Sequence, residues 1–160
     1  MSQAKGIKEV GYVDVKSGGE AHAHAAPGKR LQPASWFDCA GGGQVVVEKG
    51  IAYIGNMDNP HGTLIVDVTD PKHPQQLASI AMPKGTHSHK VRVAGDIMVT
   101  NREVQRAAAA KGEVPPDGYH GGLGIYDVSN HAKPRLITHW NTTDLPGPSY
   151  ARGVHRFDFD

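Results

Sequence analysis

One pattern of short strand-like segments occurs twice in this chain, and it restricts the possible folds more than any other feature. The first copy lies between residues 45 and 80, and the second lies between residues 91 and 140. Asp67 in the first copy corresponds to Asp127 in the second, 60 residues later, and a proline follows each aspartate seven positions further on. A unit that recurs in register indicates a repeat architecture.

Each copy consists of four short segments with the alternation and β-branched residues that favour strands. The chain has 20 glycines and 11 prolines but only 6% aromatic residues, which suits a turn-rich all-β protein. Repeated four-stranded antiparallel meanders of roughly 40 to 50 residues are typical of β-propeller blades. The sequence therefore predicts an all-β fold built from propeller blades.

The repeat also predicts how the chain is divided. Propellers generally have about four or more blades, so we expect an incomplete ring here, closed by the rest of the propeller or by other chains. The second unit is longer because it carries an insertion at 102–121, in which residues 103–111 are strong helix formers and predict a short helix. The expected parts are an N-terminal strand and loop at 1–35 (the outer strand of another blade), a first full blade at 36–82, a second full blade at 83–141 and the start of a third blade at 142–160.

The phrase Leu64-Ile65-Val66-Asp67-Val68-Thr69-Asp70-Pro71 resembles the repeat of LVIVD-repeat proteins, a β-propeller family largely without assigned activity. The second copy at 123–130 departs from this repeat and lacks the Asp-Pro pair. The resemblance covers about residues 40–160 and implies a propeller fold rather than an activity. The histidine-bearing inner strands are also distantly similar to those of selenium-binding-protein-like methanethiol oxidases, which are propellers too.

The chain contains ten histidines, and the repeat places half of them together. In a propeller, the loops between the second and third strands share one face with the segments that enter the innermost strands. Neutral imidazoles that converge there suit zinc, copper or iron, with an oxygen ligand from Asp58, Glu103 or Asp117. Loop histidines that merely hydrogen-bond the backbone are the alternative. The candidate metal ligands are His61, His87, His89, His120 and His155.

Three basic residues follow the candidate ligands or the first hairpin of the second unit, namely Lys90, Arg102 and Arg156. They are candidates for binding an anionic group of a substrate. The alternative, which we favour, is that they form salt bridges between units with Asp67, Asp127 or Asp158. The recurrence of an aspartate at the same strand end favours a structural role in the turn over a catalytic pair.

Charge and hydropathy limit the class of function. The 17 Lys and Arg residues nearly balance the 16 Asp and Glu residues, so we expect neither nucleic acid nor membrane as a partner. No apolar run approaches the roughly 20 residues of a membrane span. No apolar leader is visible after Met1, so the expected location is cytoplasmic, with a periplasmic one left open.

Two functions remain open from the sequence. One is a metal-dependent oxidoreductase or hydrolase that acts on a small-molecule substrate, with catalytic residues that the sequence does not identify. The other is a non-catalytic propeller module that binds a partner protein or a ligand.

Overall fold

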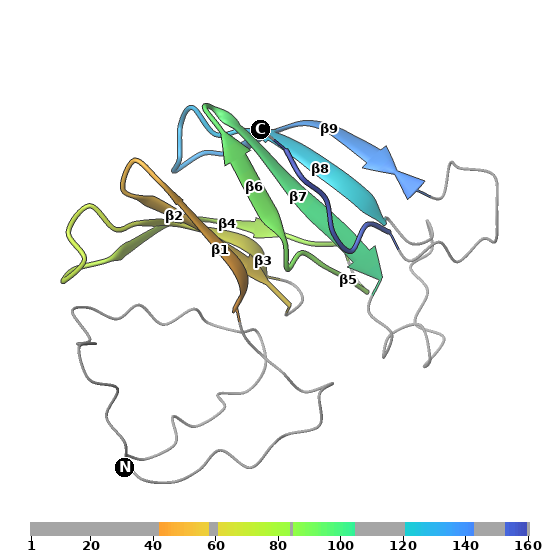
Figure 1. Ribbon diagram of the computed structural model, residues 1–160, viewed down its shortest axis with the longest axis horizontal. Helices are drawn as coiled ribbons and strands as arrows, with labels where there is room; N and C mark the ends of the chain where they lie inside the picture. The colour runs from red at the N-terminus through yellow and green to blue at the C-terminus, as the bar shows by residue number, and fades with distance from the viewer. Residues whose placement is uncertain (1–41, 58–60, 84, 105–120, 143–152, 160) are drawn as a thin grey trace, which may run out of the picture.

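The computed structural model describes residues 42–57, 61–83, 85–104, 121–142 and 153–159. These residues form two antiparallel sheets, so the all-β expectation is confirmed (Figure 1). The part described contains no helix that is long and apolar enough to cross a membrane. The strands are β1 (Gly42–Glu48), β2 (Ile51–Asn56), β3 (His61–Asp67), β4 (Gln75–Ala81), β5 (Thr86–His87), β6 (Val91–Ala94), β7 (Ile97–Val104), β8 (Gly122–Asp127) and β9 (Arg135–Asn141).

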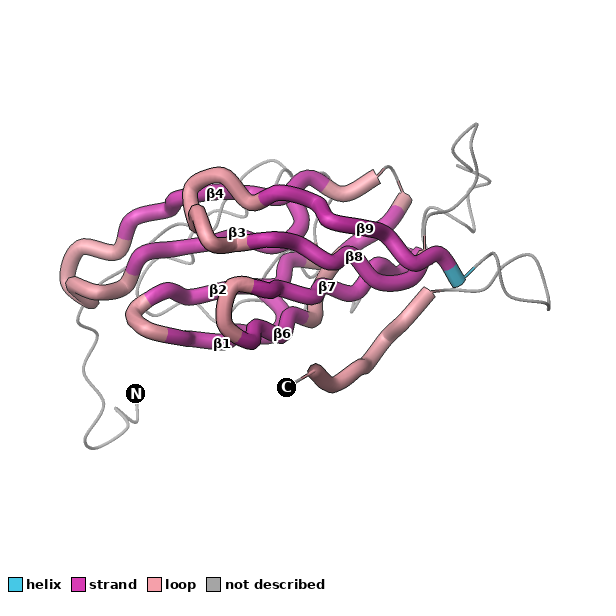
Figure 2. Tube along the Cα trace, turned by 90° about the horizontal axis from the view of Figure 1, so that it is seen from above, coloured by secondary structure: helices cyan, strands magenta, loops and turns pink. Residues whose placement is uncertain are grey.

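Both sheets are meanders. The first has the order β1-β2-β3-β4, and the second runs from β7 through β8 to β9. β6 pairs with the first half of β7, and β5 pairs with the last two residues of β7. β5 and β6 together therefore form one interrupted edge strand. Seen from above, the strands of the two sheets are laid out in the same order, from β1 to β4 and from β6 to β9 (Figure 2).

The repeat predicted from the sequence is present in the pairing register. Ile51 lies opposite Asp67 across β2 and β3, and Ile97 lies opposite Asp127 across β7 and β8. In both sheets the pairing of the last two strands also shifts, at positions that differ by 60 in residue number. The two units therefore share strand order, register and the place of an irregularity.

The aspartate that ends the third strand of each unit holds the turn that follows. Asp67 Oδ1 accepts hydrogen bonds from the backbone N–H of Thr69 at 2.8 Å and from its hydroxyl at 2.6 Å. Asp127 Oδ1 accepts the same pair from Ser129 at 3.0 and 2.7 Å. These bonds, the hydroxyl bond first, lower the pKa of both carboxyl groups, that of Asp127 to about 2. The expected structural role of the two aspartates in the turns is thus confirmed.

The hydrophobic core lies between the two sheets. Its side chains come from β2 to β4 and from β6 to β8 or directly follow these strands, and the largest fully buried side chain is that of Tyr53 in β2. Burial of this apolar surface is the main force that holds the sheets together. The core side chains are Ile51, Tyr53, Ile65, Ile80, Met82, Val91, Met98, Tyr126 and Val128.

Backbone contacts also join the sheets, at the break between β5 and β6. Ser88 forms a bridge with Asn56 of β2, and the backbone N–H of Gln44 in β1 donates to the carbonyl of His89 at 2.8 Å. Ser88 and His89 thus leave the edge of the second sheet to pair with the first, and Lys90 returns to β7, where its carbonyl accepts from the backbone N–H of Asn101 at 3.1 Å. This crossing interrupts the edge strand and positions His89, and His87 directly precedes the crossing.

Two expectations about the second unit need correction or completion. The helix predicted at 103–111 is wrong at its start, because β7 continues through Val104 and pairs there with β5. Strand pairing outweighs the helix propensity of this segment. The rest of that helix, and the expected strand at 7–15, lie outside the described residues. The two sheets form no closed ring.

Candidate metal centre

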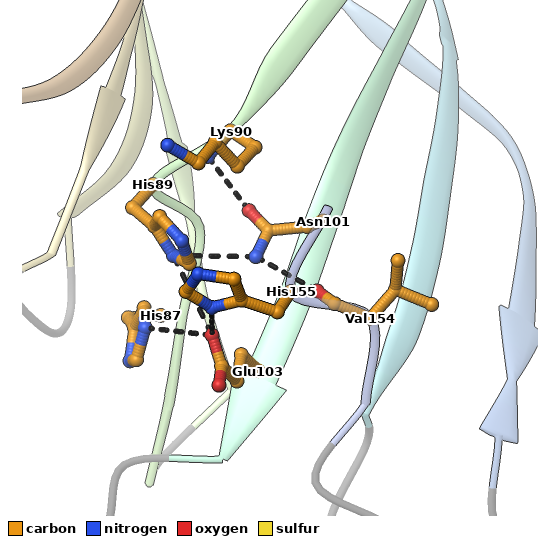
Figure 3. A network of polar contacts seen from close by, with 7 residues as sticks. All are labelled: His87, His89, Lys90, Asn101, Glu103, Val154 and His155. Atoms are coloured by element: carbon orange, nitrogen blue, oxygen red, sulfur yellow. Dashed lines mark hydrogen bonds and ion pairs between the residues drawn. The ribbon is translucent and has the colours of Figure 1, made fainter. Parts of the chain in front are cut away.

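The candidate site is built from β5, the crossing after it and the end of β7. His87 in β5 lies directly opposite Glu103 in β7, so their side chains share one face of the sheet. Ser88 points instead toward the first sheet, where its hydroxyl lies 3.0 Å from that of Thr63. His89 follows and returns to the face of Glu103 (Figure 3). The alternation of an extended chain therefore brings both histidines to one carboxylate.

The three side chains have the geometry of a ligand set. Glu103 Oε2 lies 3.6 Å from His87 Nε2 and 3.7 Å from His89 Nδ1. One ligand atom from each residue lies within 4.8 Å of the other two. Metal–ligand bonds of about 2.0–2.1 Å in a tetrahedron separate ligand atoms by about 3.3–3.4 Å. To hold a transition-metal ion, the two contacts of the carboxylate need to shorten by a few tenths of an ångström, and the two imidazole nitrogens, which lie within 4.8 Å of each other, need to approach by up to about 1.4 Å.

His155 approaches the same carboxylate from residues 153–159. Its Nδ1 lies 2.9 Å from Glu103 Oε2, and its ring centroid lies 4.8 Å from that of His89. The 2.9 Å distance is that of a hydrogen bond and is shorter than the separation of two ligands on one ion. The side chain of His155 is 66% exposed, whereas those of His87 and Glu103 are 12% and 16% exposed. His155 therefore marks the open side of the cluster.

The electrostatics of the cluster favour the metal-binding forms of two of its members. Burial, together with the neighbouring His87, lowers the pKa of His89 to about 4, so this imidazole is neutral at pH 7. Burial alone raises the pKa of Glu103, but the contacts with His87 and His155 outweigh it and lower this pKa to about 2. A neutral imidazole and an ionised carboxylate are the forms that bind metals.

Asn101 holds His89 in place. Its Oδ1 accepts the backbone N–H of Lys90 at 2.8 Å, which turns its Nδ2 toward the carbonyl of Val154, at 2.9 Å, and toward Nδ1 of His89, at 3.3 Å. An amide nitrogen is only a donor, so Nδ1 of His89 carries the lone pair in this arrangement and Nε2 carries the proton. The buried Nε2 has no hydrogen-bond partner among the described residues.

The role of Asn101 was not predicted from the sequence. The signal was available, since Asn101 precedes Glu103 by two positions in one strand and thus shares its face.

The structure brings together three of the five predicted histidine ligands, His87, His89 and His155. His61 begins β3, where its backbone pairs with Ala81, but its side chain lies outside the described part. His120 lies outside the described residues altogether. Of the oxygen ligands considered, Glu103 joins the cluster, while Asp58 and Asp117 are not described.

The predicted substrate-binding residues lie in three different places. Arg102 is buried on the opposite face of β7 from Glu103, where its Nη2 donates to the hydroxyl of Tyr126 at 3.1 Å. Lys90 adjoins the cluster through its backbone, but its side chain points away from Glu103 (Figure 3). Arg156 follows His155 and is exposed. Of the three, it is Lys90 that makes a hydrogen bond beside the candidate site, through its backbone N–H to Asn101.

The expected salt bridges between units have other partners. Asp127 pairs with Arg135 of its own unit at 2.9 Å, and Asp158 pairs with Arg92 at 3.0 Å. The second of these contacts does join residues 153–159 to the second sheet, as an inter-unit tie would. It uses a different arginine from the ones that the sequence suggested.

Comparison with known proteins provides no functional assignment. No family model, no curated protein sequence and no solved structure matches this chain. The resemblance to LVIVD-repeat proteins therefore stays an expectation from the sequence. The geometry of the cluster is therefore the basis for any function assigned to this chain.

Proposed function

We propose that this chain binds a transition-metal ion, zinc, copper or iron, through His87, His89 and Glu103. The observation that carries the proposal is the convergence of two imidazole nitrogens on one buried carboxylate oxygen, at 3.6 and 3.7 Å. Two imidazoles and a carboxylate form the ligand set of many zinc hydrolases, with water in the remaining position. The same set binds iron in non-haem oxygenases. The ion would support hydrolase or oxidoreductase chemistry on a small molecule.

The protein groups around such an ion have separate tasks. The buried His89 and the partly buried His87 and Glu103 would hold it and restrict the access of water. His155, on the open side, would become a fourth ligand or exchange a proton with a bound substrate. The exposed Arg156 beside it, and Lys90 if its side chain turns toward the site, would attract an anionic group of that substrate.

We also propose that the two sheets are blades of a β-propeller of the LVIVD-repeat kind. Residues 153–159 lie against the second sheet in the same register as residues 86–94 lie against the first. Asn56 bridges Ser88 in one contact, and Glu103 bridges Gly153 in the other. When His155 is aligned with His89, Gly153 falls one position before the residue equivalent to Ser88, and Glu103 falls one position after the residue equivalent to Asn56. The two bridges therefore belong to the same antiparallel pairing. This recurrence supports the start of a third unit in residues 153–159.

A non-catalytic binding module is the second candidate function, and one observation favours it. Leu136, Ile137 and Trp140 of β9 are each close to half exposed, at 45–47%. β9 is the last strand of its sheet among the described residues. Apolar side chains at a sheet edge are suited to contact with a partner protein.

The test is the metal content of the purified chain after incubation with Zn²⁺, Cu²⁺ or Fe²⁺ and removal of free metal. We expect one equivalent of at least one of these metals, measured by elemental analysis. Glu103→Gln, which keeps the shape of the side chain but removes its charge, weakens binding at least about tenfold because it removes one ligand. The His87→Ala, His89→Ala double variant abolishes binding.

His73→Ala is the matched control. His73 lies in the turn between β3 and β4 and contacts Asp70 rather than the cluster, so this variant keeps full metal content. A wild-type chain that stays metal-free with all three metals contradicts the proposal.

A further inference from the structure

Asn101 connects the candidate metal site to residues 153–159. It is fully buried in β7, and its amide group joins three segments of the chain. Its oxygen holds the backbone of Lys90, directly after His89, and its nitrogen holds the carbonyl of Val154. The same nitrogen lies 3.3 Å from the imidazole of His89. One side chain thus contacts both a candidate ligand and the segment that borders the site.

Residues 153–159 also make polar contacts with the second sheet that do not involve Asn101. Gly153 forms a bridge with Glu103, His155 hydrogen-bonds the carboxylate of Glu103, and Asp158 pairs with Arg92 of β6. The Asp158 contact is exposed and contributes little. Two of the polar contacts that hold the segment thus involve Asn101 and Glu103, which belong to the metal site or touch it.

We infer that Asn101 is a positioning residue that couples ion binding at His87, His89 and Glu103 to docking of residues 153–159. The inference depends on the proposed metal site. When the segment is docked, the carbonyl of Val154 holds the Nδ2 side of the Asn101 amide, so that Oδ1 keeps the backbone N–H of Lys90 in place and thereby positions the preceding His89. The hydrogen bond from Asn101 to Nδ1 of His89 uses the lone pair that an ion needs, so the ion replaces this bond when it binds. An ion held by His89 and Glu103 in turn fixes the end of β7 on which the segment docks.

Coupling of this kind is reciprocal. If docking strengthens ion binding by some factor, then ion binding strengthens docking by the same factor. Residues outside the first ligand shell that orient a ligand commonly change metal affinity about 10- to 100-fold. We expect Asn101 to act in this range, although it contacts the ion through no atom of its own.

Gly153 offers a way to undock the segment without changing any ligand. Its φ is +89°, and a Cβ built on it lies 2.0 Å from the carbonyl oxygen of Arg102. Gly153→Ala therefore moves the segment away from β7 while the core stays intact. Gly95→Ala is the matched control, since Gly95 also has a positive φ, +57°, but a Cβ there meets no atom within 4 Å.

The experiment uses Zn²⁺ alone as the probe, with two readouts on the full chain. Zinc affinity is measured by competition with a chromophoric chelator, and docking is measured by hydrogen exchange of the amides in residues 153–159. In the wild type, saturating zinc slows this exchange at least about tenfold. In Asn101→Ala, zinc binds about 10- to 100-fold more weakly, and saturating zinc no longer slows the exchange. In Gly153→Ala, exchange is fast with or without zinc and affinity falls, whereas Gly95→Ala behaves as the wild type.

Failure of the coupling and failure of the metal site give different results. A wild type that binds no zinc overturns the proposed function itself. A wild type that binds zinc with unchanged exchange in residues 153–159 overturns the coupling alone. The coupling is also overturned if zinc slows hydrogen exchange in residues 153–159 of Asn101→Ala as much as in the wild type. If Asn101→Ala does not fold, Gly153→Ala decides, because wild-type zinc affinity in that variant contradicts the coupling.

Discussion

Lowering the pH from 7 to 5 is expected to destabilise the metal-free protein through His89. Burial, followed by the neighbouring His87, lowers the pKa of this imidazole from 6.5 to about 4. Below pH 6.5 the unfolded chain binds a proton at this residue, while the folded chain does not bind one until about pH 4. The contribution of His89 to stability is therefore complete above pH 6.5 and is lost as the pH falls toward 4.

The size of the effect follows from the two pKa values. Each pH unit within the window costs at most about 1.4 kcal/mol, and about 1.5 units of the window lie between pH 6.5 and 5. We therefore expect the free energy of unfolding to fall by about 2 kcal/mol between pH 7 and pH 5. Glu103 adds little in this range, because its pKa is lowered from 4.5 to about 2 and its contribution is lost only below about pH 4.5.

The assay is urea-induced unfolding at pH 7 and pH 5, with a chelator present to keep the protein metal-free. His89→Gln, which cannot titrate, should lose about 2 kcal/mol less than the wild type over this interval. His73→Gln changes an exposed histidine in the turn between β3 and β4 and should keep the wild-type pH dependence. If His89→Gln shows the same loss as the wild type, the buried neutral state of His89 is refuted.

Three further changes test the fold and the site. Ile65→Ala, at a fully buried core position, should cost about 2–5 kcal/mol in chemical unfolding, and a loss below 1 kcal/mol would mean that the core is misplaced. Tyr53→Phe removes the 3.2 Å contact of its hydroxyl with His131 Nδ1 and should cost about 1 kcal/mol in the same assay, so an unchanged midpoint would argue against this contact. Gly55→Ala places a Cβ 2.5 Å from the carbonyl carbon of His89 and should weaken zinc binding in a chelator competition although it changes no ligand, whereas wild-type affinity would exclude this close approach.

The repeat made much of the fold predictable. In the third and fourth strands of the two copies, residues 60 positions apart do occupy the same places in the register, as Asp67 and Asp127 show. Alternation of side chains along a strand was enough to place His87 and His89 on one face. These are local rules that need no knowledge of how the two sheets pack.

Part of the cluster, His87, His89, Glu103 and His155, was predictable from the sequence, but its arrangement was not. Glu103 was named as an oxygen ligand, yet its segment was expected to be helical, because helix propensity is a weak guide where a strand finds a pairing partner. Its contacts with both His87 and His155 depend on the pairing of β5 with β7 and of Gly153 with Glu103, which are long-range. The contacts of Asn101 include a long-range one as well, to Val154, and no sequence motif marks this residue.

X-ray absorption of the zinc-loaded chain tests the central claim most directly. The account predicts a first shell of nitrogen and oxygen atoms at about 2.0–2.1 Å, with outer-shell scattering from at least two imidazoles. Zinc-loaded Glu103→Gln should show an altered first shell, because a neutral amide oxygen is a weaker ligand than a carboxylate, and the His87→Ala, His89→Ala variant should retain no zinc. Zinc that shows only the spectrum of a hydrated ion, or a spectrum that none of these changes alters, would contradict a metal centre at His87, His89 and Glu103.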